Sequence, residues 1–371
     1  MTEPTLRVAV LADTVTGGGG MARYTREIVR ALARRHDVEL VVVAPSDAGL
    51  VLDGLGLGDR VVATVPIRGG TRVGRGLWER YSLGHRLERD DVDVVHGTKH
   101  LLPRTRLPTV LTVHDLFPLT WPQQFGPVKR ALLPRQYLAS LREADALVTV
   151  SEAVRDRLAA LEPELAAKAV AAPNGLTRHL FHVDAVPVPG LVDRPFALIV
   201  GDLSPRKNAQ FLFDLWPEIH RATGLVLAAV GPDGWRSRTS RRRLAALVAE
   251  GLAARPGLVS DGELRWCYEH ARVVLLPTVE EGFGLPVLEA AAFNVPVVAN
   301  PDPALVEAGR GWPTFVELAD RAGWVRAVAA AAAMRPEPND LARSAPTWDD
   351  HASALVDAYQ RVSTDRSSVA A

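Results

Sequence analysis

The sequence predicts an α/β protein built from two doubly wound, Rossmann-like domains. Short apolar runs alternate with segments of helical periodicity over the first half of the chain. Prolines and a glycine interrupt this pattern around residues 182–195, and the alternation then restarts. Because strands buried on both faces read as continuous apolar runs, the pattern indicates two parallel sheets, each covered by helices.

The first domain is predicted over residues 1–183. Its strands are short runs rich in valine, leucine and alanine, expected at residues 6–11, 38–43, 61–65, 92–95, 109–113 and 146–150. Helices are expected where apolar residues recur with helical spacing, at residues 24–34, 132–142 and 152–161. Ser151 precedes the last of these helices and suits its N-cap.

The second domain is predicted over residues 184–345. Its strands are expected at residues 196–200, 225–230, 257–258, 273–276 and 295–299. Its helices are expected at residues 210–221, 242–250, 264–270, 286–293 and 324–334. Residues 346–371 are predicted to form a C-terminal helix at 351–362, which could return to the first domain, and a frayed tail from Ser363.

The charge balance gives no support for nucleic acid or an acidic lipid surface as a general partner. The 43 basic and 43 acidic residues cancel, so the chain has no global attraction to nucleic acid or acidic lipid. We read the arginines at 236, 238 and 241–243 as a solvated loop that leads into a helix. The single cysteine, Cys267, excludes an internal disulfide and a cysteine-cluster metal site, and we read it as a small packed residue. No metal and no cofactor are expected.

The start of the chain predicts a cytoplasmic protein. The sequence runs from Met1 into the first strand without a signal-peptide pattern. No stretch approaches the roughly 20 apolar residues that span a bilayer. A peripheral membrane contact stays open, and the oligomeric state is not readable from the sequence.

The most specific motif is Glu281-Gly282-Phe283-Gly284-Leu285-Pro286-Val287-Leu288-Glu289, directly after the predicted strand 273–276. Its glycines allow a tight turn and close approach of a ligand, and Pro286 suits the first position of a helix. The N-terminus of such a helix favours an anion such as a diphosphate. Glu289 is expected in the first helical turn, where a carboxylate suits the vicinal hydroxyls of a ribose or sugar. The alternative to a ligand site is a glycine turn that only caps the strand, with both glutamates exposed to solvent.

A second motif, Gly201-Asp202-Leu203-Ser204-Pro205-Arg206-Lys207-Asn208, follows the first strand of the second domain. Adjacent Arg206 and Lys207 at a strand end can neutralise a diphosphate without a metal, since arginine offers a planar fork and lysine a compact charge. A solvated turn that contains Pro205 is the alternative.

Two segments of the first domain complete the candidate site. Residues 16–24 hold four consecutive glycines, including Gly19 and Gly20, and fit a dinucleotide fingerprint weakly, because the run begins several residues past the strand and no acidic residue ends the second strand. His114 follows the predicted strand 109–113, and the carboxyl end of such a strand faces the ligand crevice. His96, Lys99 and His100 lie near the end of the preceding strand as acceptor-side candidates. A structural histidine is the alternative for His114.

These motifs together closely resemble the retaining glycosyltransferases of the GT-B fold, family 4 type (glycosyltransferase group 1). The resemblance covers roughly residues 6–362. It implies two Rossmann-like domains that face a central cleft, with the acceptor on the first domain and the nucleotide sugar on the second. The residues implied to bind the donor are Gly19, Gly20, Gly201, Arg206, Lys207, Glu281, Phe283, Gly284, Leu285 and Glu289. The residues implied to take part in catalysis are His114, Arg206, Lys207 and Glu281.

The resemblance implies a metal-independent transfer of a hexose from a nucleotide-diphosphate sugar to a glycan, a lipid-linked sugar or a small-molecule hydroxyl. The segment His114-Asp115-Leu116 resembles mannosyl- and rhamnosyltransferases, which favours GDP-mannose and leaves UDP- and dTDP-sugars open. The alternatives are a catalytically idle sugar-nucleotide-binding protein of the same fold, an NAD-dependent oxidoreductase, or a GT-B epimerase or phosphorylase.

The sequence departs from this family in three places. After Pro303 the family's longer strand and Asp-Pro turn are replaced by Gly309-Arg310-Gly311-Trp312-Pro313, and then a short helix is expected. The segments 68–75 and 117–127 also find no close match. We expect these two segments to shape the choice of acceptor.

Overall fold

The computed structural model describes residues 5–67, 78–334 and 339–370. The chain forms two compact units, which we describe separately. The N-terminal unit comprises Met1–Gly175 and Pro346–Ala371, and the C-terminal unit comprises Leu176–Ala345. The sequence predicted the boundary at residue 183, but Leu180 is buried in the core of the C-terminal unit, so the chain enters that unit earlier.

The N-terminal unit is built on a parallel sheet with the strand order β3-β2-β1-β4-β5-β6-β7. The strands are β1 (Leu6–Leu11), β2 (Val38–Ala44), β3 (Val61–Pro66), β4 (Val94–Gly97), β5 (Thr109–Val113), β6 (Ala146–Thr149) and β7 (Ala169–Ala171). The helices are α1 (Gly20–Ala33), α2 (Gly49–Asp53), α4 (Leu83–Arg89), α5 (Phe117–Thr120), α6 (Pro127–Glu143), α7 (Glu152–Leu161), α8 (Pro163–Ala167) and α16 (Trp348–Ala370). Ser151 caps α7 as predicted, since its Oγ accepts a hydrogen bond from the backbone N–H of Val154 at 3.1 Å.

The C-terminal unit repeats this architecture, with the strand order β10-β9-β8-β11-β12-β13 and every pair parallel. Its strands are β8 (Phe196–Val200), β9 (Val226–Val230), β10 (Ala253–Gly257), β11 (Val273–Leu276), β12 (Val297–Ala299) and β13 (Thr314–Phe315). Its helices are α9 (Ala209–Thr223), α10 (Arg238–Ala249), α11 (Asp261–His270), α12 (Leu285–Ala292), α13 (Pro303–Gly309), α14 (Arg321–Ala333) and α15 (Leu341–Ser344). Two doubly wound parallel sheets confirm the predicted fold class.

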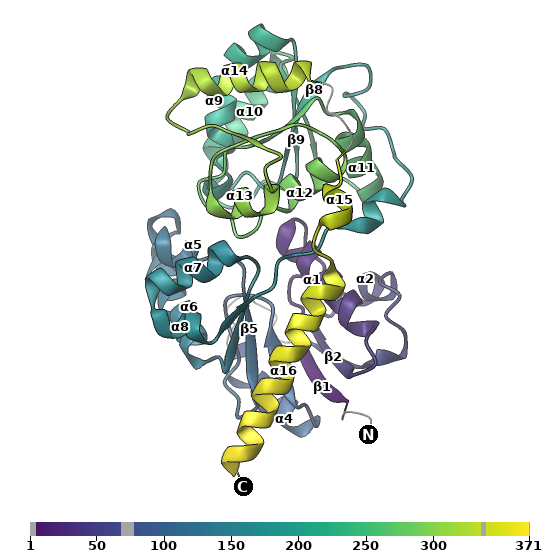
Figure 1. Cartoon of the computed structure of the whole chain (residues 1–371), viewed down its shortest axis with the longest axis vertical. Coiled ribbons are helices and arrows are strands. Elements are labelled where there is room, and N and C mark those ends of the chain that lie inside the picture. Colours follow the sequence, from purple (N-terminus) through teal and green to yellow (C-terminus); the bar gives the residue numbers. More distant parts are fainter. Residues whose placement is uncertain (1–4, 68–77, 335–338, 371) are drawn as a thin grey trace. The chain divides into compact units, whose positions relative to one another are not determined.

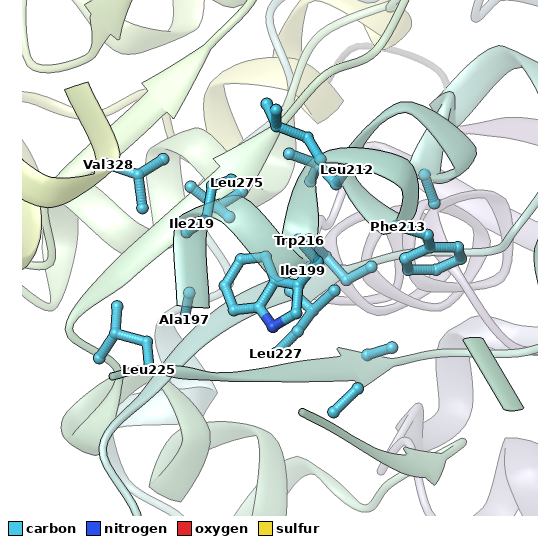
Figure 2. Packing of buried hydrophobic residues seen from close by; sticks show 14 of the residues in the cluster. Ala197, Ile199, Leu212, Phe213, Trp216, Ile219, Leu225, Leu227, Leu275 and Val328 are labelled. Carbon is cyan, nitrogen blue, oxygen red and sulfur yellow. The ribbon is translucent and has the colours of Figure 1, made fainter. Parts of the chain in front are cut away.

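The sheet of the C-terminal unit is buried on both faces, as its apolar runs predicted. Along β8, Ala197 and Ile199 pack on one core cluster, whereas Phe196 and Leu198 pack on the opposite one. This division follows from the two-residue period of a strand. Figure 2 shows Trp216 of α9 at the centre of the first cluster. Its indole Nε1–H donates to the Leu252 carbonyl at 2.8 Å, so the buried polar atom is satisfied.

Several element boundaries differ from the predictions. β4 begins at Val94, two residues later than predicted. The preceding residue, Asp93, accepts the backbone N–H of Arg7 through its carboxylate at 2.7 Å. β10 lies at Ala253–Gly257 rather than at 257–258. After Pro303 the chain forms α13 and then the two-residue strand β13, both absent from the prediction. The segment 68–75 lies outside the described residues.

The C-terminal helix α16 belongs to the N-terminal unit, where it contacts α1, β4, β5 and β6 (Figure 1). Its buried side chains include Leu355, Val356 and Tyr359. The predicted frayed tail from Ser363 is wrong, since the helix continues to Ala370. The helix thus packs on the sheet of the N-terminal unit, although it lies at the other end of the chain. The hydrogen bond between Tyr24 of α1 and His351 of α16, which are 327 residues apart, is one of the contacts that join them.

Candidate active site

The motif loops of the C-terminal unit lie at its topological switch point. β8 and β11 are neighbours in the middle of the sheet, and the strand order runs in opposite directions from them. The loops that leave their carboxyl ends are residues 201–208 and 277–284. In open α/β sheets, the crevice outside such a pair of strand ends is where ligands bind.

Arg206, Lys207 and Glu281 meet at this edge. One Glu281 oxygen accepts from the Arg206 guanidinium at 2.9 Å, and the other accepts from Lys207 Nζ at 2.5 Å. Glu281 is 7% exposed, and both cations are largely buried. The three side chains carry a net charge of one positive unit, since two cations face one carboxylate. This cluster, which we call the cation–carboxylate cluster, holds two positive charges in place at a strand edge suited to an anion.

The charge state of Glu281 is set by its two partners. Burial raises the pKa of its carboxyl group, but the charges of Arg206 and Lys207 outweigh that effect and lower the pKa from 4.5 to about 2. Glu281 is therefore ionised at neutral pH and acts as a hydrogen-bond acceptor.

The two loops are also tied together through the backbone. Asn208 adopts a left-handed conformation with φ 51°, and its side-chain amide donates to the Pro277 carbonyl at 3.1 Å. The N–H of Val279 donates to the Arg206 carbonyl at 3.0 Å. Because both bonds cross from one loop to the other, the position of Arg206 relative to Glu281 does not depend on the ion pair alone.

Glycines let backbone segments approach closely behind the cluster. Gly201 and Gly231 have φ angles of 138° and 134°. A Cβ atom on Gly231 would lie 2.1 Å from the Gly201 carbonyl oxygen, so no other residue fits there without a shift. Gly284, with φ 104°, precedes α12 as its N-cap, and a Cβ there would lie 2.7 Å from Leu305 Cδ2.

Glu289 lies on α12, after the loop that carries Glu281. The expectation that it lies in the first turn of its helix is wrong, because α12 starts at Leu285 and its first turn holds no acidic residue. Glu289 is 2% exposed, and its Oε2 accepts from the Tyr268 hydroxyl of α11 at 2.7 Å. The Tyr268 ring stacks on Phe293 at 5.4 Å, so α11 and α12 together orient this carboxylate. Phe283 and Leu285 are also buried.

Asp302 also contacts the candidate site and was not predicted from the sequence. Its Oδ2 accepts the backbone N–H of Glu281 at 3.3 Å, while its Oδ1 accepts the N–H of Ala304 at 2.9 Å and caps α13. It therefore connects the segment after β12 to the backbone of Glu281. The sequence did contain a signal, an aspartate directly before Pro303, since aspartate at an N-cap followed by proline marks a helix start.

In the N-terminal unit, the glycine-rich loop also leaves a strand at a switch point, because β1 and β4 are neighbours where the strand order reverses. Gly19 has φ 83° and ψ −172°, a conformation that essentially only glycine adopts. α1 therefore starts at Gly20, earlier than the predicted residue 24. A Cβ atom added to Gly19 or to Gly20 would meet no heavy atom within 4 Å, so the loop surface is open there. Arg26 braces the loop by donating to the carbonyls of Val15 and Gly17 at 3.0 Å.

His114 lies at the same sheet edge, after β5. Its Nε2–H donates to the Thr98 carbonyl at 3.0 Å, and its ring meets the Tyr24 ring edge-on at 4.5 Å. His114 is partly buried, whereas His96 is fully buried with both ring nitrogens hydrogen-bonded inside the unit. His96 is thus a core residue rather than an acceptor-side residue. Lys99 lies 3.4 Å from Asp13 and links the loops after β4 and β1.

Cys267 and the arginine-rich segment were interpreted as structural features. Cys267 is buried in α11, as predicted for a small packed residue. The arginines from 238 lie on α10, where Arg241 pairs with Asp233 at 3.0 Å.

Among residues 5–67, 78–334 and 339–370, no group of three histidine, cysteine or carboxylate side chains could hold a metal ion. Within the same ranges, no helix combines the length and the apolar character needed to cross a bilayer.

Two family models match the chain. Residues 18–179 match "Glycosyltransferase Family 4", and residues 194–333 match "Glycosyl transferases group 1". The first match covers the glycine-rich loop and His114, and the second covers the cation–carboxylate cluster and Glu289.

Similar proteins agree with these matches. The O-antigen chain mannosyltransferase B of Escherichia coli is 28% identical over 57% of this chain, and the match spans 58% of its own length. The O-antigen chain mannosyltransferase RfbU of Salmonella typhimurium is 24% identical over 84% of this chain and 86% of its own length. Among solved structures, Anabaena Alr3699/HepE in complex with UDP and glucose superposes with a TM-score of 0.67 at 15% identity, covering 96% of this chain and 100% of that chain. This structural likeness shows the shared fold.

Proposed function

Since the chain belongs to the GT-B glycosyltransferases of the family 4 and group 1 type, we propose that it is a retaining, metal-independent hexosyltransferase. The donor is a nucleotide-diphosphate sugar, with GDP-mannose as the first choice, and the acceptor is a hydroxyl group of a growing glycan. The names of the E. coli and S. typhimurium relatives, both O-antigen chain mannosyltransferases, support mannose and a polysaccharide acceptor. The cation–carboxylate cluster is the observation that carries this proposal.

The C-terminal unit binds the donor in this proposal. Arg206 and Lys207 contact the diphosphate, and the N-terminus of α12 at Leu285 adds backbone N–H groups that point toward it. Glu281 keeps both cations extended toward the crevice and offers a carboxylate oxygen to a sugar hydroxyl. Glu289, oriented by Tyr268, accepts hydrogen bonds from the ribose hydroxyls. Gly201 allows the backbone to approach the phosphates because it lacks a side chain.

The reaction then depends mainly on stabilising the leaving group. The bond between the anomeric carbon and the phosphate oxygen breaks, and its electron pair stays on the diphosphate, where Arg206 and Lys207 hold the developing negative charge. The acceptor oxygen bonds to the anomeric carbon on the face that the phosphate leaves, and its proton passes to the departing phosphate. No side chain is required as a general base. His114 and the loop at Gly19 and Gly20 belong to the N-terminal unit, which binds the acceptor in this proposal.

Two measurements test this proposal. Purified protein is screened for thermal stabilisation by UDP, GDP, ADP, dTDP and NADH in the presence of EDTA, because a ligand that binds only the folded state raises the melting temperature. A rise with one nucleoside diphosphate identifies the base. The anomeric configuration of the product, read by NMR with the matching donor, then decides between retention and inversion. Stabilisation by NADH alone would overturn the proposal in favour of an oxidoreductase.

A peripheral contact with an anionic membrane surface is a further part of the proposal. On α6, Val128 is 72% exposed and Leu132, one turn further on, is 51% exposed, with Lys129 and Arg130 between them. Residues 116–142 contain no aspartate or glutamate. Exposed apolar side chains beside cations suit the boundary of an anionic bilayer. Co-sedimentation with vesicles that contain an acidic lipid, but not with neutral vesicles, is expected, and it should be lost in the double variant Val128→Asp, Leu132→Asp.

A further inference from the structure

A continuous chain of buried hydrogen bonds runs through the N-terminal unit. Tyr359 of α16 contacts His96 Nδ1 at 2.7 Å, and His96 Nε2 contacts Thr112 Oγ1 at 2.8 Å. Thr112 Oγ1 contacts the Tyr24 hydroxyl at 2.8 Å, and this hydroxyl contacts His351 Nε2 at 3.1 Å. All five side chains are almost fully buried. Elements that are far apart in the sequence, β4, β5, α1 and α16, therefore share one polar network.

The contact between His351 and Pro173, at one end of the network, determines which group donates and which accepts in every hydrogen bond of the network. His351 Nδ1 lies 3.3 Å from the Pro173 carbonyl, which can only accept a hydrogen bond, so Nδ1 carries the proton. A neutral His351 must then accept at Nε2, and the Tyr24 hydroxyl must donate to it. Tyr24 in turn accepts from the Thr112 hydroxyl, since its own proton is already used.

His96 and Tyr359, at the other end of the network, also have defined donor and acceptor roles. Because the Thr112 proton points to Tyr24, Thr112 Oγ1 accepts from His96, so His96 carries its proton on Nε2. His96 Nδ1 then accepts from the Tyr359 hydroxyl. The network therefore requires opposite tautomers, with the proton on Nε2 in His96 and on Nδ1 in His351. Burial supports the neutral forms, because it lowers the pKa of His96 to about 3 and that of His351 to about 4.

One member of the network also touches the candidate site. The Tyr24 ring lies perpendicular to the His114 ring, with 4.5 Å between centroids. His114 also donates to the Thr98 carbonyl. A carbonyl at the end of β4 and an aromatic ring whose hydroxyl is held by the network thus both contribute to the orientation of His114.

We propose that Tyr24 is a positioning residue for His114, and that His351 of the C-terminal helix holds Tyr24 in place. The inference rests on the proposed function only for the role of His114 in transfer. A buried polar network costs desolvation energy that apolar side chains would avoid, and when every member is satisfied it specifies one arrangement of its members. Here that arrangement sets the ring of Tyr24 against His114.

Two tyrosine variants separate positioning from general stability. Tyr24→Phe and Tyr359→Phe each remove one buried hydroxyl from the same network, and the Tyr24 ring lies edge-on against His114. We expect similar losses in melting temperature for both. In Tyr24→Phe we expect shifted imidazole NMR signals of His114 and a fall in kcat of roughly tenfold, since small misplacements of a catalytic group reduce turnover. In Tyr359→Phe the His114 signals and kcat should match the wild type.

A second pair of variants covers the case in which Tyr24→Phe does not fold. His351→Gln places its amide near the Nε2 position and keeps an acceptor for Tyr24, whereas His351→Asn places its amide near Nδ1 and does not. We expect near wild-type His114 signals and kcat for the glutamine variant and a loss for the asparagine variant. The inference would be overturned if the His114 signals and kcat were the same for both variants of either pair, or if the histidine tautomers were opposite to those stated above.

The imidazole signals keep this test independent of the proposed function. If the wild-type protein transferred no sugar from any donor, the proposed function would fail. The tautomers of His96 and His351, and the response of His114 to Tyr24→Phe, would still decide the positioning role.

Discussion

Lys207 Nζ lies 2.5 Å from Glu281 Oε2, although 74 residues separate them in the chain. The contact forms because β8 and β11 are neighbours at the switch point of their sheet, so the loops that carry Lys207 and Glu281 leave the same edge. A buried carboxylate that is bound by two cations loses part of both its ion pairing and its hydrogen bonding if either partner is removed.

We expect Arg206→Ala and Lys207→Ala each to lower kcat/KM with the nucleotide-sugar donor by about 10- to 100-fold, which corresponds to the roughly 1.5–3 kcal/mol of a hydrogen bond to a charged group. Titration calorimetry with the nucleoside diphosphate should show weaker binding in both. Arg238→Ala, which removes an exposed arginine from the start of α10, is the control. If both Arg206→Ala and Lys207→Ala transferred sugar at rates near the wild type, the proposal that these residues bind the donor diphosphate would be rejected.

Glu281 should make folding sensitive to acid. Its pKa is lowered from 4.5 to about 2 in the folded state, so the carboxylate stabilises the fold above pH 4.5 and this contribution is lost as the pH falls to about 2. Glu281→Gln lacks that contribution at every pH. Urea unfolding curves should therefore show a less stable variant at pH 7 and a smaller difference from the wild type at pH 3. If the difference in unfolding free energy between the wild type and Glu281→Gln were the same at pH 7 and pH 3, the stabilising role of the ion pair would be contradicted.

Tyr268→Phe should loosen Glu289. Loss of one buried hydrogen bond is expected to cost about 1 kcal/mol of stability. The sharper readout compares binding of a nucleoside diphosphate with that of its 2′,3′-dideoxy analogue. If Glu289 contacts the ribose, the wild type prefers the natural ligand, and the variant should lose part of this preference. Tyr137→Phe, which removes a hydroxyl that donates to the Asp115 carbonyl, is the matched control and should keep it.

Gly231→Ala tests the close approach behind the cluster. The new Cβ would lie 2.1 Å from the Gly201 carbonyl oxygen, so the backbone at Gly201 or at Gly231 must move, and Gly201 begins the loop that bears Arg206. Gly251 also has a positive φ, 73°, but no atom lies within 4 Å of a Cβ there. We expect Gly251→Ala to cost about 1–2 kcal/mol from backbone strain alone. Gly231→Ala should cost more and also weaken nucleotide binding, as measured by denaturation and calorimetry.

The two buried histidines predict a second effect of pH. Burial lowers the pKa of His96 from 6.5 to about 3 and that of His351 from 6.5 to about 4. As the pH falls below 6.5, the unfolded chain therefore takes up protons that the folded chain refuses, and stability is lost. Each histidine contributes a slope of about 1.4 kcal/mol per pH unit. Between pH 6 and pH 5, His351→Gln should show a shallower pH dependence than the wild type in urea unfolding, and equal slopes would contradict this account.

Local pattern was sufficient to predict most strands and helices. The strands at Leu6–Leu11, Thr109–Val113, Phe196–Val200 and Val273–Leu276 begin and end where their apolar runs do. The loops at Arg206 and Glu281 follow two of these strands directly, so their position at a sheet edge was readable as well. The short β13 and α13 were missed, because a two-residue strand has no periodicity to detect and a seven-residue helix has little.

What the sequence determined by itself was the alternation of strand and helix, and with it the edge at which Arg206, Lys207 and Glu281 lie, because apolar periodicity and glycine turns are local properties. Tertiary structure alone decided which side chains pair. The contact of Asp302 with the Glu281 backbone, the anchoring of Glu289 by Tyr268 and the hydrogen bond from Tyr24 to His351 join separate elements. Such contacts depend on strand order and on the packing of helices against the sheet, and no spacing within one segment encodes them.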